Sequence, residues 1–154
     1  MGSNAPVSIR RAIMPAVLAT LVLCGCGGSS LSMAQLRSDA NRICTDASQQ
    51  TDRIPTPTSP TGGAAFLKRG DAAIATELRR LRMLRPPSDA ADVYSSALDV
   101  SSAELASLRT TVGQLDRGGD PAGTITSLQH RLRPMESRAN AAWHSLAISA
   151  CVDR

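Results

Sequence analysis

The chain has few aromatic residues and few strand-like patterns. Among its 154 residues only three are aromatic, Phe66, Tyr94 and Trp143. Alternating runs of β-branched or aromatic residues, which are typical of strands, are also scarce. The apolar residues are mostly alanine and leucine, and such a core favours helices. The composition therefore predicts an all-α protein.

The chain also lacks the sequence motifs of common enzymes. It contains no HExxH, G-x-S-x-G, P-loop or GxGxxG sequence. His130 and His144 stand fourteen residues apart, too far along one helix to share a metal ion. We therefore predict no metal, no cofactor and no enzymatic activity. The alternative is an envelope hydrolase in which one of these histidines meets a carboxylate and a serine.

The N-terminal segment has the order of a secretory signal. Arg10 and Arg11 precede an apolar run over residues 12–23, which as a helix is shorter than the ~20 residues needed to cross a bilayer. The run ends at Leu23-Cys24-Gly25-Cys26, which resembles the lipobox of bacterial lipoproteins, with Gly25 before the lipid-modified Cys26. Cys24 is the weaker candidate, because Leu23 would then stand where a small residue is required. In the alternative, both cysteines are incidental to an ordinary signal.

The lipobox resemblance divides the chain into three parts. Residues 1–25 are a signal peptide that is removed, residues 26–32 are a lipidated Gly/Ser-rich tether, and residues 33–154 are the folded domain. One acyl chain holds a protein to a membrane only marginally, whereas the diacylglyceryl cysteine that the resemblance implies is sufficient. We therefore expect a palmitate-bearing lipoprotein on the extracytoplasmic face of the cell membrane.

Neither sign of charge dominates the predicted mature protein. The net charge of +4 falls to +2 when Arg10 and Arg11 leave with the signal peptide. A nucleic-acid-binding protein is normally strongly basic on one face, so we predict no nucleic-acid partner.

Capping signals and chain breakers divide the domain into helical segments. Ser32 and Gln35 predict a capping box at the start of a first helix over residues 33–52. The Pro-rich stretch 54–63 cannot continue it and is read as a surface loop, with a Pro-x-x-Pro-like ligand as the alternative. A second helix follows over residues 64–84.

The last two helices are also bounded by local signals. Ser88 or Asp89 is expected to cap the third helix, which closes at Gly118-Gly119. Asp120 then caps the fourth, with Pro121 at its first position. Arginines crowd the end of the second helix, where they complement the helix dipole or, alternatively, contact anionic lipid headgroups; they are Arg79, Arg80, Arg82 and Arg85.

Four helices with mostly short connections predict an antiparallel up-down four-helix bundle. Pro134 lies in the apolar stripe of the last helix and is expected to kink or break it. Cys44 and Cys151 form an even pair in an exported chain, so we predict one disulfide between the first and last helices. Closing a loop of about 108 residues contributes on the order of 4–5 kcal/mol in the chain-entropy model. With this pairing, about eleven residues of the first helix would project beyond the bundle as a stalk.

Several short motifs also carry a family resemblance. They are Asn41-Arg42-Ile43-Cys44, Pro86-Pro87, Gly119-Asp120, and Ala139-Asn140-Ala141-Ala142 with a terminal Cys151. This arrangement is similar to uncharacterised small helical lipoproteins of high-GC Gram-positive bacteria. The resemblance implies the bundle, the cysteine pair and the anchor, and it carries no functional site.

The resulting hypothesis is a lipid-anchored binding or scaffolding protein with a partner in the cell envelope. Loops 54–63 and 118–120, farthest from the anchor, are the first place to expect such a partner. The alternative is a carrier of a small hydrophobic ligand in the bundle core, with Leu132, Met135 and Trp143 as candidate ligand-binding residues. Trp143 is also expected to be the largest packing element, with a hydrogen-bond partner or a surface position for its indole N–H.

Overall fold

The computed structural model of the protein describes residues 29–152. Within that range the chain forms four α-helices and two short 3-10 helices and contains no strand, which confirms the all-α prediction. The predicted signal peptide, with Cys24, and the predicted lipidation site Cys26 lie outside the described residues. The elements are α1 (Met33–Asp52), η1 (Pro60–Gly62), α2 (Gly63–Arg82), α3 (Ala91–Asp116), α4 (Pro121–Ser145) and η2 (Ser149–Cys151).

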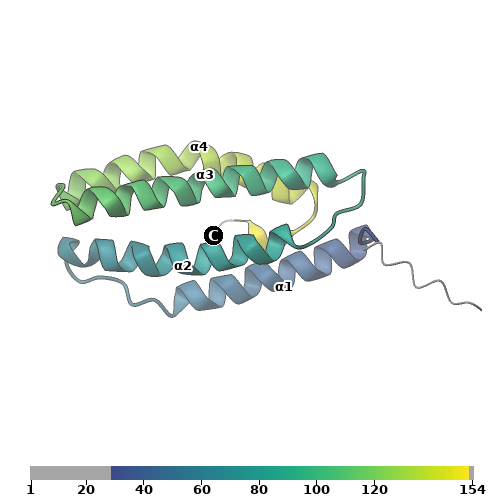
Figure 1. Ribbon diagram of the computed structural model, residues 1–154, viewed down its shortest axis with the longest axis horizontal. Helices are drawn as coiled ribbons and strands as arrows, with labels where there is room; N and C mark the ends of the chain where they lie inside the picture. The colour runs from purple at the N-terminus through teal and green to yellow at the C-terminus, as the bar shows by residue number, and fades with distance from the viewer. Residues whose placement is uncertain (1–28, 153–154) are drawn as a thin grey trace, which may run out of the picture.

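The four helices form two side-by-side pairs. Figure 1 shows α1 beside α2 and α3 beside α4, with η2 between the two pairs. α2 also packs on α3, and η2 contacts both α1 and α4. The C-terminal segment therefore supplies part of the interior of the molecule.

The start of α1 follows its capping signals. Ser32 Oγ accepts a hydrogen bond from the Gln35 backbone N–H at 3.3 Å, and Gln35 Oε1 accepts one from the Ser32 N–H at 2.9 Å. The predicted capping box and both boundaries of this helix are confirmed. The predicted stalk is wrong, because Leu36 and Ala40 in the first turns of α1 are fully buried.

The last two helices begin differently. Ala90 occupies the N-cap position of α3 without a side-chain hydrogen bond, so the predicted cap by Ser88 or Asp89 is wrong. α4 begins as predicted, with Asp120 Oδ2 accepting a hydrogen bond from the Gly123 N–H at 2.8 Å. α4 then continues to Ser145 with the exposed Pro134 inside it, so the helix is not broken at that residue.

A tight turn after α4 returns the chain to the core. The N–H of Ile148 donates to the Trp143 carbonyl and the N–H of Ala147 to the His144 carbonyl, both at 3.0 Å, and Ala147 has a φ of 56°. This is the pattern of a Schellman motif, in which glycine usually takes the left-handed position. The turn directs the fully buried Ile148 and then η2 toward α1.

The cysteine pair lies at disulfide distance, with the Cα atoms of Cys44 and Cys151 5.2 Å apart. The predicted pairing is therefore confirmed, but its location between the first and last helices is wrong. Cys151 lies in η2, beyond the end of α4. Asn41 of α1 holds the same segment, since its Oδ1 accepts a hydrogen bond from the Ala150 N–H at 2.8 Å.

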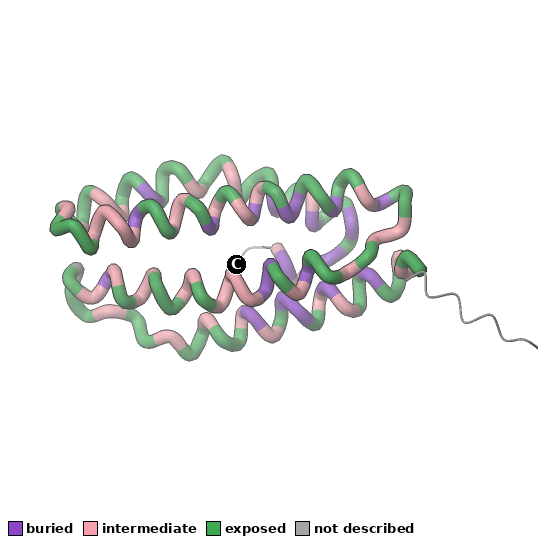
Figure 2. The backbone as a smooth tube through the Cα atoms, viewed as in Figure 1, coloured by how far each residue is buried: buried purple, intermediate pink, exposed green. Residues whose placement is uncertain are grey.

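The buried residues gather on one side of the molecule's midpoint. Figure 2 shows most of them around η2 and the neighbouring parts of the helices. Trp143 is fully buried there and meets Tyr94 edge to face, with ring centroids 5.7 Å apart. Its indole Nε1 has no hydrogen-bond partner among the described residues, contrary to the prediction. The packing role predicted for Trp143 is confirmed.

Candidate ligand-binding cavity

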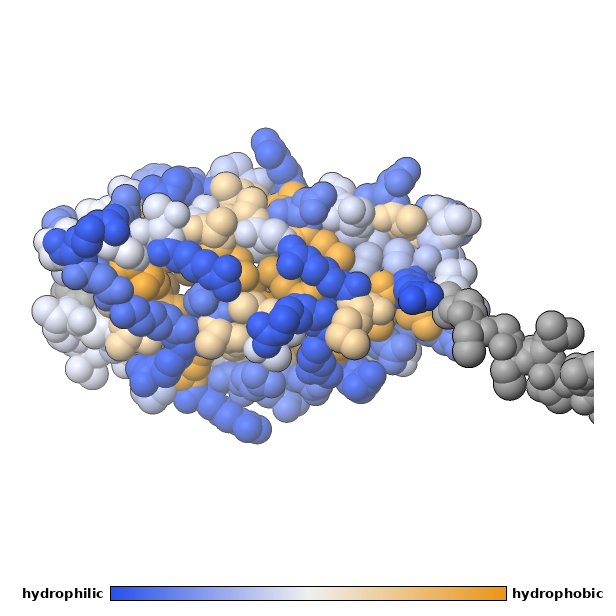
Figure 3. All heavy atoms as spheres, viewed as in Figure 1, coloured by the Kyte–Doolittle hydropathy of each residue, from blue (hydrophilic) through white to orange (hydrophobic). Residues whose placement is uncertain are grey.

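A partly open cavity of about 430 Å³ lies between the helices. All four α-helices and η2 contribute to its wall, which combines small, apolar and polar side chains. Figure 3 shows that the visible face is hollowed along the seam between the two helix pairs, with apolar residues inside the hollows. The lining residues are Ala47, Ser48, Thr51, Ile74, Glu77, Leu78, Ser101, Glu104, Glu136, Ala139, Asn140 and Cys151.

The cavity results from small residues on facing helices. Ala47 of α1, Ser101 of α3 and Ala139 of α4 are all buried, and each leaves space that a larger side chain would fill. Closely packed protein interiors contain few voids larger than a water molecule, so a space of this size is a distinct feature of the fold. Cys151 of η2 forms part of the same wall.

Three glutamates line the cavity, and they are all the glutamates of the chain. Glu77 comes from α2 and is only 3 % exposed, Glu104 from α3 is partly buried, and Glu136 from α4 is exposed. The ten aspartates of the chain all lie elsewhere or outside the described residues. The cavity therefore gathers carboxylates at different depths, with Glu136 at its outer edge.

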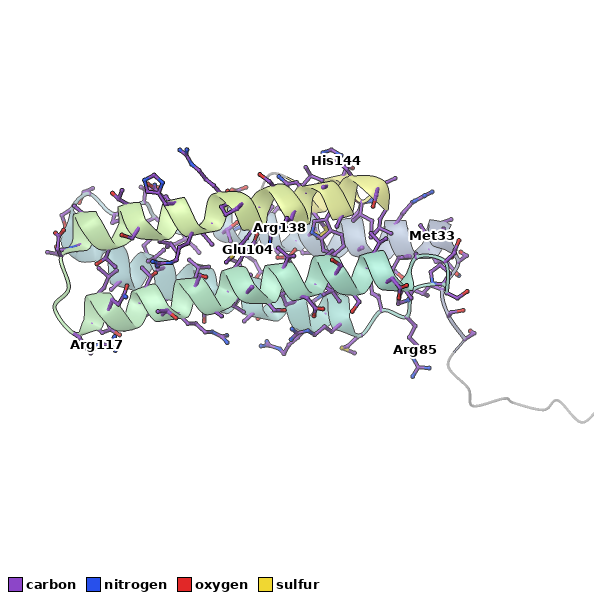
Figure 4. The ribbon with its side chains drawn as sticks, turned by 90° about the horizontal axis from the view of Figure 1, so that it is seen from above. Met33, Arg85, Glu104, Arg117, Arg138 and His144 are labelled. Atoms are coloured by element: carbon purple, nitrogen blue, oxygen red, sulfur yellow. A yellow bond between two sulfur atoms is a disulfide. The ribbon has the colours of Figure 1, made fainter. Side chains whose placement is uncertain are left out.

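The carboxyl group of Glu104 is held in an unfavourable environment. Burial, and to a smaller extent the neighbouring charge of Glu136, together raise its pKa to about 7. Its Oε1 atom is buried and has no hydrogen-bond partner among residues 29–152. Figure 4 shows Glu104 at about the middle of the molecule's length, between α3 and α4. Near neutral pH this carboxyl group is poised to gain or lose a proton.

Ser101 adds a second polar group whose bonding is incomplete. The residue is only 3 % exposed and lines the cavity from α3, one turn before Glu104. Its Oγ has no hydrogen-bond partner in the described part of the chain. Because buried polar atoms are bonded in roughly nine cases out of ten, such an atom beside a cavity is a candidate contact for a ligand.

The geometry bears on metal binding in two ways. Among the described residues, one group of potential ligand atoms lies within 4.8 Å, formed by Cys44, Glu77 and Cys151. The two sulfurs of that group are joined to each other, so they offer no thiolate. The carboxylate oxygens of the three glutamates do not all lie within 4.8 Å of one another, so they do not form such a group. The arrangement suits a ligand longer than a single ion.

The candidate residues predicted from sequence lie outside this cavity. Leu132, Met135 and Trp143 are all on α4, but none of them lines the cavity wall. His130 and His144 are exposed on the same helix and do not line it either. The glutamates carried a signal that the sequence interpretation missed. Glu77 interrupts the apolar stripe of α2, three residues after Ile74 and four before Leu81.

The arginines at the end of α2 bind neighbouring residues. Arg80 pairs with Asp46 of α1 at 2.8 Å, and Arg82 donates to Ser102 Oγ of α3 at 2.6 Å. Met83, the next residue, is 79 % exposed. Figure 4 places Arg85 at the same end of the molecule as Met33, and Arg117 at the opposite end.

The chain matches no protein-family model, no curated protein and no solved structure. None of the helices within residues 29–152 combines the length and apolar character needed to span a membrane.

Proposed function

We propose that this protein is a lipid-anchored binding protein of the cell envelope that holds a small molecule in the cavity between its helices. The observation that carries the proposal is the cavity of about 430 Å³, which all four α-helices and η2 line. Ligand pockets typically measure ~300–1,000 Å³ and combine an apolar wall with a few placed polar groups. The cavity has both properties, with Ile74 and Leu78 among the apolar residues.

Binding is better supported than hydrolysis or scaffolding. A hydrolase with a histidine base needs that residue beside its nucleophile, and neither histidine lines the cavity. A scaffolding role at loops 54–63 and 118–120 has no comparable feature behind it. The sequence alone suggests a carrier of a hydrophobic ligand. The cavity wall is acidic as well as apolar, so the ligand that it suits is not purely hydrophobic.

The anchor remains a proposal based on the lipobox at Cys26. It is supported by the position of the first described residues, since the Leu31 N–H donates to the Arg85 carbonyl at 2.8 Å. Five residues extend at most ~17 Å, so a lipid on Cys26 would hold the Arg85 end of the domain near the membrane. The exposed Met83 at that end suits the headgroup region of a bilayer.

We also propose that the bundle is antiparallel and up-down, with a kink in α4. The short connection between α3 and α4 favours the antiparallel arrangement, because a few residues can join only neighbouring helix ends. Pro134 favours the kink in α4, because proline lacks the backbone N–H that would bond the His130 carbonyl.

Two experiments test the two parts of the proposal. Native mass spectrometry of the protein purified from its own membranes in mild detergent should find a small molecule bound, and a ligand-free protein in every preparation argues against the carrier role. Labelling with palmitate should modify the wild-type chain but not Cys26→Ser. If Cys26→Ser is processed and retained at the membrane like the wild type, the proposed lipid anchor is wrong.

A further inference from the structure

We propose that the cavity binds a small organic cation, an amine or guanidinium compound, through the carboxylates of Glu104 and Glu136. The inference deepens the proposed function and rests on it. It specifies the charge and the shape of the ligand, and both are inferred from the residues that line the cavity.

The charge of the ligand follows from the side chains that face the cavity. α2, α3 and α4 each contribute one glutamate, whereas α1 contributes the uncharged Ser48 and Thr51 and η2 contributes a disulfide-bonded cysteine. No basic residue is among the described residues of the wall. The charge of Glu136 raises the pKa of Glu104 because the two carboxylates repel each other, and a cation placed beside them removes this repulsion.

The hydroxyl group of Ser101 independently points to a ligand. Its buried Oγ lines the cavity without a hydrogen-bond partner in the described range. Ammonium and guanidinium groups carry several N–H donors, which is what an unpaired hydroxyl oxygen and an unpaired carboxylate oxygen, such as Oε1 of Glu104, both require. An aliphatic ligand without donors would leave both oxygens unsatisfied.

The shape of the ligand follows from the spacing of the carboxylates and from the apolar wall. The oxygens of the three glutamates do not all come within 4.8 Å of one another, so they do not form one compact metal site. Ile74, Leu78 and Ala139 supply apolar surface in the same cavity. An alkyl chain can lie against these residues while its charged ends reach different glutamates, as in an aliphatic diamine or an alkyl guanidine.

The test uses the full chain purified in detergent and three probes of similar length. These are 1,5-diaminopentane as the cation, 1-pentanol as the neutral analogue and pentanoate as the anion, each followed by isothermal titration calorimetry at pH 8. The diamine should bind with the highest affinity. Its affinity should fall at least about fivefold between pH 8 and pH 6, because Glu104 is protonated at the lower pH.

Substitutions identify the site. Glu104→Gln and Glu136→Gln should each weaken binding of the diamine about tenfold, as loss of a hydrogen bond to a charged group does. Ser101→Ala should weaken it by a smaller factor. Asp116→Asn is the matched control, since it removes the same charge from an exposed residue outside the cavity wall and should leave the affinity unchanged. Circular dichroism confirms that each variant is folded.

The outcomes separate this inference from the proposed function. Stronger binding of pentanol or pentanoate than of the diamine overturns the cationic ligand but leaves a binding protein. Diamine binding that is unaffected by both glutamate substitutions also overturns it, because the site then lies elsewhere. Binding of Ca²⁺ or Zn²⁺ that displaces the diamine and depends on the same glutamates contradicts the preference for an organic cation. Failure of all three probes to bind counts against the inference, while a neutral or anionic molecule found by native mass spectrometry would still support the carrier role.

Discussion

Replacement of Glu104 by glutamine should stabilise the protein at pH 8 but not at pH 4. Glutamine has nearly the same shape as glutamate and carries no charge. In the folded protein the Glu104 pKa is raised from 4.5 to about 7, mainly by burial and in part by Glu136. The ionised carboxylate is therefore less stable in the folded chain than in the unfolded chain, and the substitution removes this penalty.

The sign of the pH dependence follows from the protons bound in each state. Between about pH 4.5 and 7 the unfolded chain has lost the Glu104 proton while the folded chain keeps it, so stability falls as the pH rises through this window. Below it both states are protonated and Glu104 has no effect. Above it both are ionised and the full penalty applies.

The magnitude is set by the pKa difference and reduced by solvent. A shift from 4.5 to about 7 corresponds to at most about 3 kcal/mol. Glu104 keeps some exposure, which screens its charge, so we expect Glu104→Gln to raise the free energy of unfolding at pH 8 by about 1–2 kcal/mol.

Urea denaturation followed by the fluorescence of Trp143 measures this difference, since Trp143 is the only tryptophan. Wild type and Glu104→Gln should have equal stability at pH 4 and should separate progressively up to pH 7. Glu136→Gln should give a smaller gain, because it removes only the neighbouring charge. A difference between wild type and Glu104→Gln that is the same at pH 4 and pH 8 would refute the buried, charge-strained carboxyl group.

Three further substitutions test the fold. Ala147→Gly should stabilise by about 1 kcal/mol, since glycine adopts the left-handed conformation without strain, and a loss of stability in urea denaturation would contradict the turn. Pro134→Ala should stabilise by about 1–2 kcal/mol by giving the His130 carbonyl an N–H donor; an unchanged urea midpoint would mean that this carbonyl is already satisfied. Thiol labelling of the unfolded, unreduced protein should detect no free Cys44 or Cys151, and alanine at both positions should cost about 2–5 kcal/mol; two reactive thiols would rule out the disulfide.

The helices could be predicted because their boundaries are encoded locally. Ser32 with Gln35, and Asp120 with Pro121, specify helix starts through contacts within four residues, and the structure confirms both. The start of α3 was predicted incorrectly from the same kind of signal. Ser88 and Asp89 are suitable caps, but the chain makes a further turn, in which the Ala90 N–H donates to the Pro87 carbonyl, before α3 begins.

The position of the C-terminal segment could not be predicted from local signals. The reversal after α4 places Ala147 in a left-handed conformation, for which the usual marker is glycine. Without that marker, the sequence pattern predicts Cys151 at the end of the last helix, whereas it lies in η2. The actual turn is held by side chains far away in the sequence. Arg37 Nε donates to the Leu146 carbonyl at 2.8 Å, and Asn41 binds the Ala150 N–H.

The acidic cavity was missed because charged residues are normally assigned to the solvent-exposed face of a helix. That rule succeeds for Lys68 and Asp116, which form an exposed ion pair. It fails for Glu77, which is buried although it lies in an otherwise apolar stripe. Glu104, which lines the same cavity, lowers the stability of the fold when it is ionised, as its raised pKa indicates. A residue that weakens a fold in this way is expected where the fold binds something, and Glu104 lines the cavity.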